Sequence, residues 1–230
     1  LLTELAPLGA VRQYIMEHPD NPPPLPTRLQ MALDVVTGVA YLHSKGVQHY
    51  DMSCRILFLF GGFRVKLGDF GASLLQGHDF APTLCEESQY ELPLRGRLFD
   101  DRPPAKRELF ALGSAIFEIT SWERPFQGLP DEEVELRYAR DEFPSLIGNP
   151  AGWVIQKCWN EESETASEVL ENLTQCLVTP NIHSRSRCPW PSEVDRLCQG
   201  LAEPELYALG LLGPFATTEL LGQREADQRS

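Results

Sequence analysis

Residues 49–71 read HYDMSCRILFLFGGFRVKLGDFG. Two runs within them, 55–60 and 63–67, are rich in apolar side chains and flank the pair Gly61-Gly62. A glycine pair between such runs predicts a β-hairpin, because the tight hairpin turns need positive φ angles that glycine adopts without strain. A two-residue turn would place residue 60 opposite residue 63 and Cys54 opposite Asp69.

The predicted hairpin brings two acids to its open end. Asp69 directly follows the second strand, and Asp51 lies three residues before Cys54. Carboxylates that converge in this way suit a divalent cation or a general base. Spacing alone leaves another interpretation open, in which Asp51 and Asp69 only cap turns, as Asp often does.

Apolar side chains at helical spacing predict the remaining core. A capping box of Thr27 and Gln30 predicts a helix that begins after the stiff segment 21–26 and ends near Gly46. A second helix, 106–120, is apolar on nearly all sides, so we expect it to be buried all round. The other predicted helices are 131–140, 152–159 and 165–177. The fold class is therefore mainly α, with a small β-hairpin and a buried central helix.

Two smaller expectations concern the end of this region. The tryptophans Trp153 and Trp159 are expected in the core, since large aromatic side chains contribute most when buried. The acidic run Glu161, Glu162 and Glu164 is typical of a solvated face.

Composition limits the classes of partner. The 230 residues are 42% hydrophobic, which is ordinary for a chain with a buried core. The net charge of −13, from 20 basic and 33 acidic residues, argues against nucleic acids and anionic membranes as partners. No apolar run approaches the roughly 18 residues of a membrane helix. The six cysteines include no Cys-x-x-Cys pair. We therefore expect reduced thiols and an intracellular, cytoplasmic protein.

The order of the motifs resembles the protein kinase family. His49-Tyr50-Asp51, six residues after the first helix, resembles the catalytic loop, and Asp69-Phe70-Gly71 resembles the metal-binding motif. The helix that contains 108–113 is similar to the central helix of that family, and residues 3–9 are similar to its hinge. Further likenesses are found at 122–128, similar to the loop before the substrate-side helix, and at Cys158-Trp159. The resemblance implies an α+β kinase-like domain over 1–178, consisting of the hinge and the C-terminal lobe, followed by an extension of unknown role, 179–230.

The resemblance also implies a reaction, ATP-dependent phosphoryl transfer to protein hydroxyl groups, and a role for individual residues. Asp51 would accept or orient the proton of the substrate hydroxyl, and Asp69 would hold Mg²⁺. Arg55 would supply the positive charge found in tyrosine-kinase-like catalytic loops. In the hinge, the backbone carbonyl of Glu4 and the N–H of Ala6 would bond the adenine edge of ATP. The partner would be a protein substrate or a protein bound without catalysis.

Several positions depart from the family pattern. The second magnesium ligand, an Asn, falls on Ile56, whose apolar side chain offers no donor to a hard cation, so that metal position is lost. Tyr50 replaces the Arg that reads activation-loop phosphate, so such control should be absent or different. Glu91 stands at the acidic end of the activation segment, but its expected Arg partner falls on Ala166.

The start of the sequence bears on activity as well. The glycine-rich loop and the Lys–Glu pair of the family lie upstream of the hinge, and this chain begins at its hinge-like segment, so we expect no N-terminal lobe within it. Losing several such contacts leaves little catalysis. The sequence therefore predicts an impaired or inactive kinase-like domain. The alternative is a pseudokinase-type interaction module that binds a protein through its acidic exterior and the surface around 122–138.

Overall fold

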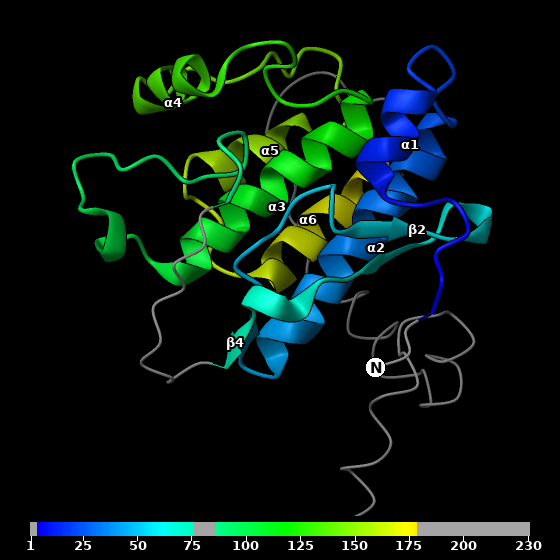
Figure 1. Ribbon diagram of the computed structural model, residues 1–230, viewed down its shortest axis with the longest axis horizontal. Coiled ribbons are helices and arrows are strands. Elements are labelled where there is room, and N and C mark those ends of the chain that lie inside the picture. Colours follow the sequence, from blue (N-terminus) through cyan, green and yellow to red (C-terminus); the bar gives the residue numbers. More distant parts are fainter. Residues whose placement is uncertain (1–3, 76–85, 179–230) are drawn as a thin grey trace, which may run out of the picture. The chain divides into compact units, whose positions relative to one another are not determined.

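Helices build the core of the region that the structure describes, residues 4–75 and 86–178 of a computed structural model (Figure 1). The α-helices are α1 (Val11–Glu17), α2 (Leu25–Ser44), α3 (Pro104–Ser121), α4 (Asp131–Ala139), α5 (Gly152–Trp159) and α6 (Ala166–Val178). The strands are β1 (Val47–Gln48), β2 (Leu57–Leu59), β3 (Val65–Leu67) and β4 (Leu74–Leu75), with 3₁₀ turns η1 (Gly61–Phe63), η2 (Phe70–Ala72) and η3 (Phe99–Asp101). The predicted fold class, mainly helical with a small hairpin, is confirmed.

Helix α3 is the centre of this core. Every residue from Arg107 to Thr120 is buried, as the apolar pattern predicts. The helix lies between α2 and α5, and α6 packs on α2 (Figure 1). Gly113 permits the close approach of α5, because a Cβ atom there would lie 2.6 Å from the Cβ of Cys158.

The two tryptophans of α5 have different surroundings. Trp159 is fully buried, as expected, but Trp153 is 45% exposed, so its predicted place in the core is wrong. The two residues are six positions apart, which places their side chains about 120° apart around a helix. One helix face therefore cannot bury both.

The start of α2 also differs from the prediction. The helix begins at Leu25, with Pro26 in its first turn and no side chain capping its N-terminus, so the capping box of Thr27 and Gln30 does not form. Proline fits the first turn because its missing N–H would have no partner there, and its φ angle is already helical. Gln30 instead donates to Asp34 one turn later.

Strands β2 and β3 form the predicted hairpin with a register shifted by one residue. Leu57 pairs with Leu67 and Leu59 pairs with Val65, so three residues, not two, make the loop. Positive φ angles occur at Gly62 and Phe63, and the Phe63 ring packs edge-on against Tyr14 of α1 at 5.8 Å. The longer loop gives Phe63 this partly buried position, which a glycine-only turn would not provide.

The side chain of Asp34 fixes the hairpin to α2. The buried carboxylate of Asp34 on α2 accepts from the Arg64 guanidinium at 2.7 and 3.0 Å and from the Val65 N–H at 3.0 Å. Strand β1 pairs with β4, which brings the segment after α2 beside the segment after the hairpin. These two segments carry Asp51 and Asp69.

Within residues 4–75 and 86–178, no helix combines the length and apolar character needed to cross a membrane.

Candidate active site

His49 and Glu108 hold the catalytic-loop segment in place. The Glu108 carboxylate, on α3, accepts from the His49 backbone N–H at 2.8 Å and lies 3.0 Å from the His43 ring. The His49 ring is buried and bonds the Gly68 carbonyl at 2.9 Å, directly before Asp69. The His49 ring therefore links the segment that carries Asp51 to the segment that carries Asp69.

Asp51 and Asp69 lie at the same open end of the hairpin, as predicted. Burial raises the pKa of the Asp51 carboxyl, and the charges of Asp69 and Glu87 raise it further, against the opposing guanidinium of Arg55. Asp69 itself is exposed and has a left-handed backbone, with φ at 52°. The raised pKa makes Asp51 a better base than an ordinary Asp.

Ile56 decides how well this site fits a metal ion. Its side chain is 4% exposed and belongs to the hydrophobic core, while its carbonyl accepts from the Gly68 N–H at 3.1 Å. No group of three or more His, Cys, Asp or Glu side chains in the described residues is placed to hold a metal ion. The apolar Ile56 side chain offers no oxygen to a second magnesium ligand position, so the residues do not fit the complete metal site that the resemblance implies.

The hinge-like segment runs beside the hairpin. The Leu8 N–H donates to the Leu59 carbonyl at 3.2 Å, and the Leu59 N–H donates to the Gly9 carbonyl at 2.8 Å. The Glu4 carboxylate accepts from the Lys66 ammonium at 2.7 Å. Among the residues that the structure describes, no hydrogen bond occupies the Glu4 carbonyl or the Ala6 N–H, the two groups predicted to bond adenine.

Arg55 links the predicted catalytic acid to the end of the activation segment. Its Nη2 lies 3.4 Å from Asp51, and its Nε lies 3.0 Å from Glu87. The side chain remains 57% exposed. Arg55 therefore keeps donors free beside Asp51.

Sequence reasoning missed Glu87, on which three arginines converge. Arg12 of α1 and Arg124 both bond its carboxylate, the latter at 2.8 Å, and Arg55 completes the set. Burial alone would raise the pKa of Glu87, but the charge and hydrogen bond of Arg12 and the charges of the other two guanidiniums hold it below its ordinary value. Arg12 also donates twice to buried Glu118 at 2.9 Å.

The end of the activation segment is fixed by ion pairs that the sequence pattern did not predict. Glu91 pairs with Arg102 at 2.9 Å, in place of the family partner whose position is Ala166. Arg95 and Arg97 both bind Glu161, at 2.6 and 2.7 Å. The expectation that Glu161 belongs to a solvated face is therefore wrong.

Tyr50, the residue in place of the phosphate-reading Arg, lies under a different basic group. The Arg107 guanidinium is 5.6 Å from the Tyr50 ring centre and pairs with the Glu86 carboxylate at 2.7 Å. Both partners are buried. Arg107, which lies next to the catalytic loop, is therefore already paired with the Glu86 carboxylate of the same chain.

These features define a protein-kinase-like lower lobe: a hairpin that presents two acids, a catalytic loop held by a central helix, and an activation segment tied down by arginines. Comparison with known proteins agrees. Residues 1–176 match the family described as protein tyrosine and serine/threonine kinase. The chain belongs to that protein kinase family.

Individual relatives are similar over large parts of this chain. The serine/threonine/tyrosine-protein kinase HT1 of Arabidopsis thaliana is 28% identical over 77% of this chain and 48% of its own length. The dual specificity testis-specific protein kinase 1 of Rattus norvegicus is 34% identical over 100% of this chain and 37% of its own length. The insulin receptor of Xenopus laevis is 28% identical over 74% of this chain and 14% of its own length. The chain spans about half, or less, of these relatives.

Proposed function

We propose that residues 1–178 form the hinge and substrate-side lobe of a protein kinase domain whose ATP-dependent phosphoryl transfer to protein hydroxyl groups is impaired. Residues 179–230 would be an extension of it. The observation that carries the proposal is the apolar, buried Ile56 beside the two converging acids Asp51 and Asp69. Asp51 and Asp69 keep the acidic groups that the family uses in phosphoryl transfer. Ile56 stands where the family has the second magnesium ligand, so that ligand is lost.

The remaining side chains have definite tasks in this proposal. Asp51, made more basic by burial, would accept or orient the hydroxyl proton of the substrate. Arg55, with donors free beside Asp51, would balance negative charge there. The Glu4 carbonyl and the Ala6 N–H would bond the adenine edge of ATP. Because the residues do not fit a complete magnesium site, we assign no step to the metal.

The partner would be a protein and the location inside the cell. The net charge of −13 disfavours nucleic acid as a ligand. The three cysteines within the described residues, Cys54, Cys158 and Cys176, are free thiols, which is compatible with a reducing setting.

The effect of Ile56 can be tested by substitution. Ile56→Asn restores an oxygen donor, and Ile56→Val is the matched control because it stays apolar. We measure thermal shifts with ATP in the presence and absence of Mg²⁺, and transfer of labelled phosphate to protein, on the longest form of the protein that is expressed. The Asn variant should gain Mg²⁺-dependent ATP binding and about 10- to 100-fold in transfer, while the Val variant should match the unaltered protein.

Two results would contradict the impaired-kinase proposal. An unaltered protein that transfers phosphate at a rate typical of kinases, about 1 per second or more, would show that no impairment exists. An absence of nucleotide binding in both the unaltered protein and the Asn variant would favour the interaction module. Helix α4 favours that second candidate, since Glu132 and Glu135 are exposed there and Leu136 is 52% exposed.

A further inference from the structure

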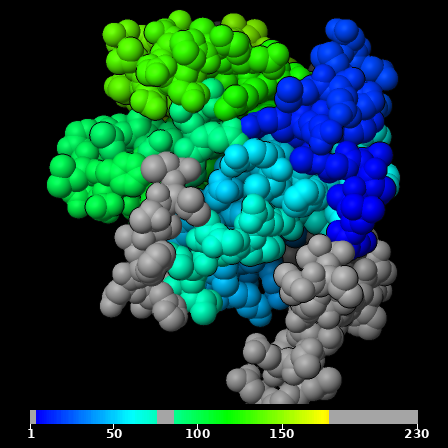
Figure 2. Space-filling view, viewed as in Figure 1, coloured from blue at the N-terminus to red at the C-terminus, as the bar shows by residue number. Residues whose placement is uncertain are grey.

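Cys54, three residues after Asp51 in the catalytic loop, is held from two sides. The Arg12 backbone N–H donates to the Cys54 carbonyl at 3.0 Å, where α1 lies against the loop (Figure 2). The Cys54 N–H donates to the Tyr90 hydroxyl at 3.3 Å. Cys54 and Tyr90 are both 0% exposed. The loop is therefore fixed at one residue by α1 and by the end of the activation segment.

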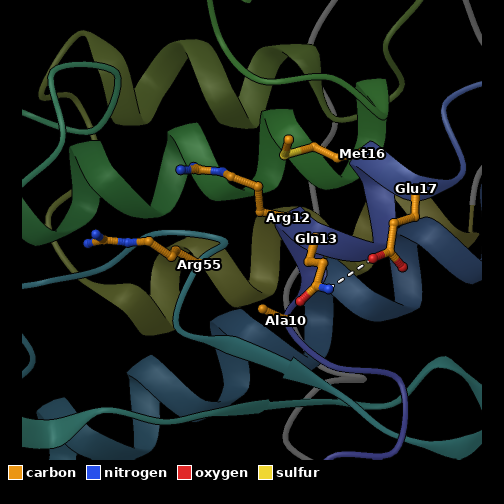
Figure 3. Close-up of a pocket in the computed structure, with 6 residues that line it drawn as sticks. All are labelled: Ala10, Arg12, Gln13, Met16, Glu17 and Arg55. Carbon is orange, nitrogen blue, oxygen red and sulfur yellow. Dashed lines mark hydrogen bonds between the residues drawn. The ribbon is translucent and has the colours of Figure 1, made fainter.

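The Tyr90 hydroxyl is in turn held by Glu118 of α3. It donates to the Glu118 carboxylate at 2.6 Å, and that side chain is 1% exposed. Arg12 donates to the same carboxylate from Nε and Nη2, at 2.9 Å each, and its side chain runs from α1 along α3 (Figure 3). One buried acid of the central helix thus joins α1, the activation segment and, through Tyr90, the catalytic loop.

The two bonds of the Tyr90 hydroxyl use its proton and one oxygen lone pair. Burial, together with the Cys54 thiol and the Glu118 carboxylate, holds the pKa of Tyr90 well above its ordinary value of 10.0. The hydroxyl therefore keeps its proton, which it donates to Glu118, and its oxygen accepts from Cys54. Phenylalanine would fill almost the same volume but would leave the buried Cys54 N–H without an acceptor.

The end of the activation segment is fixed to α3 at two of its residues. The Tyr90 N–H donates to the Glu87 carbonyl at 2.6 Å, and the Glu87 carboxylate bonds the Arg12 guanidinium. Arg12 therefore holds the activation segment at Glu87, and Glu118 holds it at Tyr90. Because Glu118 also binds Arg12, both contacts depend on the same buried acid.

From this arrangement we infer that Tyr90 is a positioning residue for the catalytic loop. Its hydroxyl connects the Cys54 N–H to Glu118 of the central helix and so sets the place of Asp51. The inference rests on the proposed function for the task of Asp51, whereas the hydrogen bonds that carry it can be measured without nucleotide.

The test is Tyr90→Phe in the complete chain, isotope-labelled and studied by NMR without nucleotide. Loss of the acceptor should move the Cys54 amide-proton signal upfield and shift the amide signal of Asp51. It should also speed hydrogen exchange at the Cys54 amide by at least about tenfold relative to the Ile155 amide. Ile155 lies in α5, where its N–H donates to the Ala151 carbonyl at 3.0 Å, so its exchange reports opening of the core.

Tyr138→Phe is the matched control. Tyr138 is 1% exposed, and its hydroxyl donates to the Gln89 carbonyl at 3.1 Å. Each variant loses one buried hydroxyl bond beside the activation segment, but only Tyr90→Phe removes the acceptor of the Cys54 N–H. The Tyr138 variant should keep the exchange of Cys54 relative to Ile155 within about twofold of that in the unaltered protein.

Unchanged Cys54 exchange, or an unchanged Asp51 signal, in folded Tyr90→Phe overturns the inference. So does an equal change in the Tyr138 variant, or faster exchange at Cys54 that Ile155 matches, since these results show a loss of stability alone. If circular dichroism shows that Tyr90→Phe does not fold, the unaltered protein decides the matter. Its Tyr90 hydroxyl proton should give an NOE to the Cys54 amide proton, and the absence of that NOE overturns the inference. Failure of ATP binding or phosphate transfer affects only the proposed kinase activity, since these NMR measurements contain no nucleotide.

Discussion

Single carboxylates in this lobe connect segments that are far apart in the sequence. Glu161, after α5, accepts from Arg95 and Arg97, and Arg95 also donates to the Trp159 carbonyl at 2.9 Å. The Glu161 side chain is 16% exposed. An ion pair of this kind in a partly buried network contributes more than an isolated surface pair.

Replacement of Glu161 should therefore cost stability. Glu161→Gln keeps the shape but removes the charge, so we expect the free energy of unfolding at neutral pH to fall by about 2 kcal/mol in urea denaturation. Glu171→Gln, an exposed carboxylate on α6, is the control and should change stability by less than about 0.5 kcal/mol.

The same variant has a predictable pH dependence. Hydrogen bonds from Arg97 lower the pKa of Glu161 below its ordinary value of 4.5, against the smaller effect of burial, and Arg95 adds to the lowering. Since the unfolded chain binds the proton more readily, the stabilisation is complete above pH 4.5 and is lost as the pH falls through the lowered pKa. The stability difference between the protein and Glu161→Gln should shrink on acidification, and a constant difference would contradict this account.

At the scale of single residues, the sequence predicted the positions of those that belong to ordered motifs. Asp51, Asp69 and Ile56 were predicted because their neighbours fix their positions in the family pattern. Glu87 was not predicted, since its partners Arg12 and Arg124 lie 75 and 37 positions away. Rules that rest on local spacing cannot predict contacts between residues so far apart in the sequence.

Among the elements, the close packing of α3 on α5 can be tested by one substitution. Gly113→Ala would place a methyl group 2.6 Å from the Cys158 Cβ and 3.4 Å from the Trp159 ring. Neither atom can move without shifting a buried helix, so we expect a loss of about 2 kcal/mol in the free energy of unfolding and a lower melting temperature.

Two hairpin glycines supply the controls. Gly61→Ala meets no atom within 4 Å and has no positive φ, so it should be neutral within about 0.5 kcal/mol. Gly62 also has open space, but its φ is 69°, and alanine there should cost about 1 kcal/mol. If Gly61→Ala destabilised the chain as much as Gly113→Ala, the packing argument would fail.

Element types were more predictable than their boundaries. Helix α5 begins and ends as predicted, at Gly152 and Trp159. The start of α2 was misplaced because proline is compatible with a first turn as well as with a loop. The hairpin register was misplaced because it depends on the tertiary contact of Phe63 with Tyr14.

Across the whole molecule, the site and the core are built from the same elements. Helix α3 carries both the buried centre and Glu108, which holds the catalytic loop, and α2 carries the Asp34 that holds the hairpin. The buried hydrophobic side chains of the described residues extend from Val11 to Leu173.

A fragment of residues 1–178 should therefore fold without the residues that follow. It contains the hydrophobic core, the hairpin anchor and the ion-pair network of the described residues, so we expect one cooperative thermal transition within about 4 °C of that of the complete chain. Near-ultraviolet circular dichroism provides the second measurement, because fully buried Trp159 and Tyr90 report side-chain packing. A fragment that kept its helical signal but lost the aromatic signal would show that residues 179–230 supply packing this core requires, and that the proposed domain boundary is wrong.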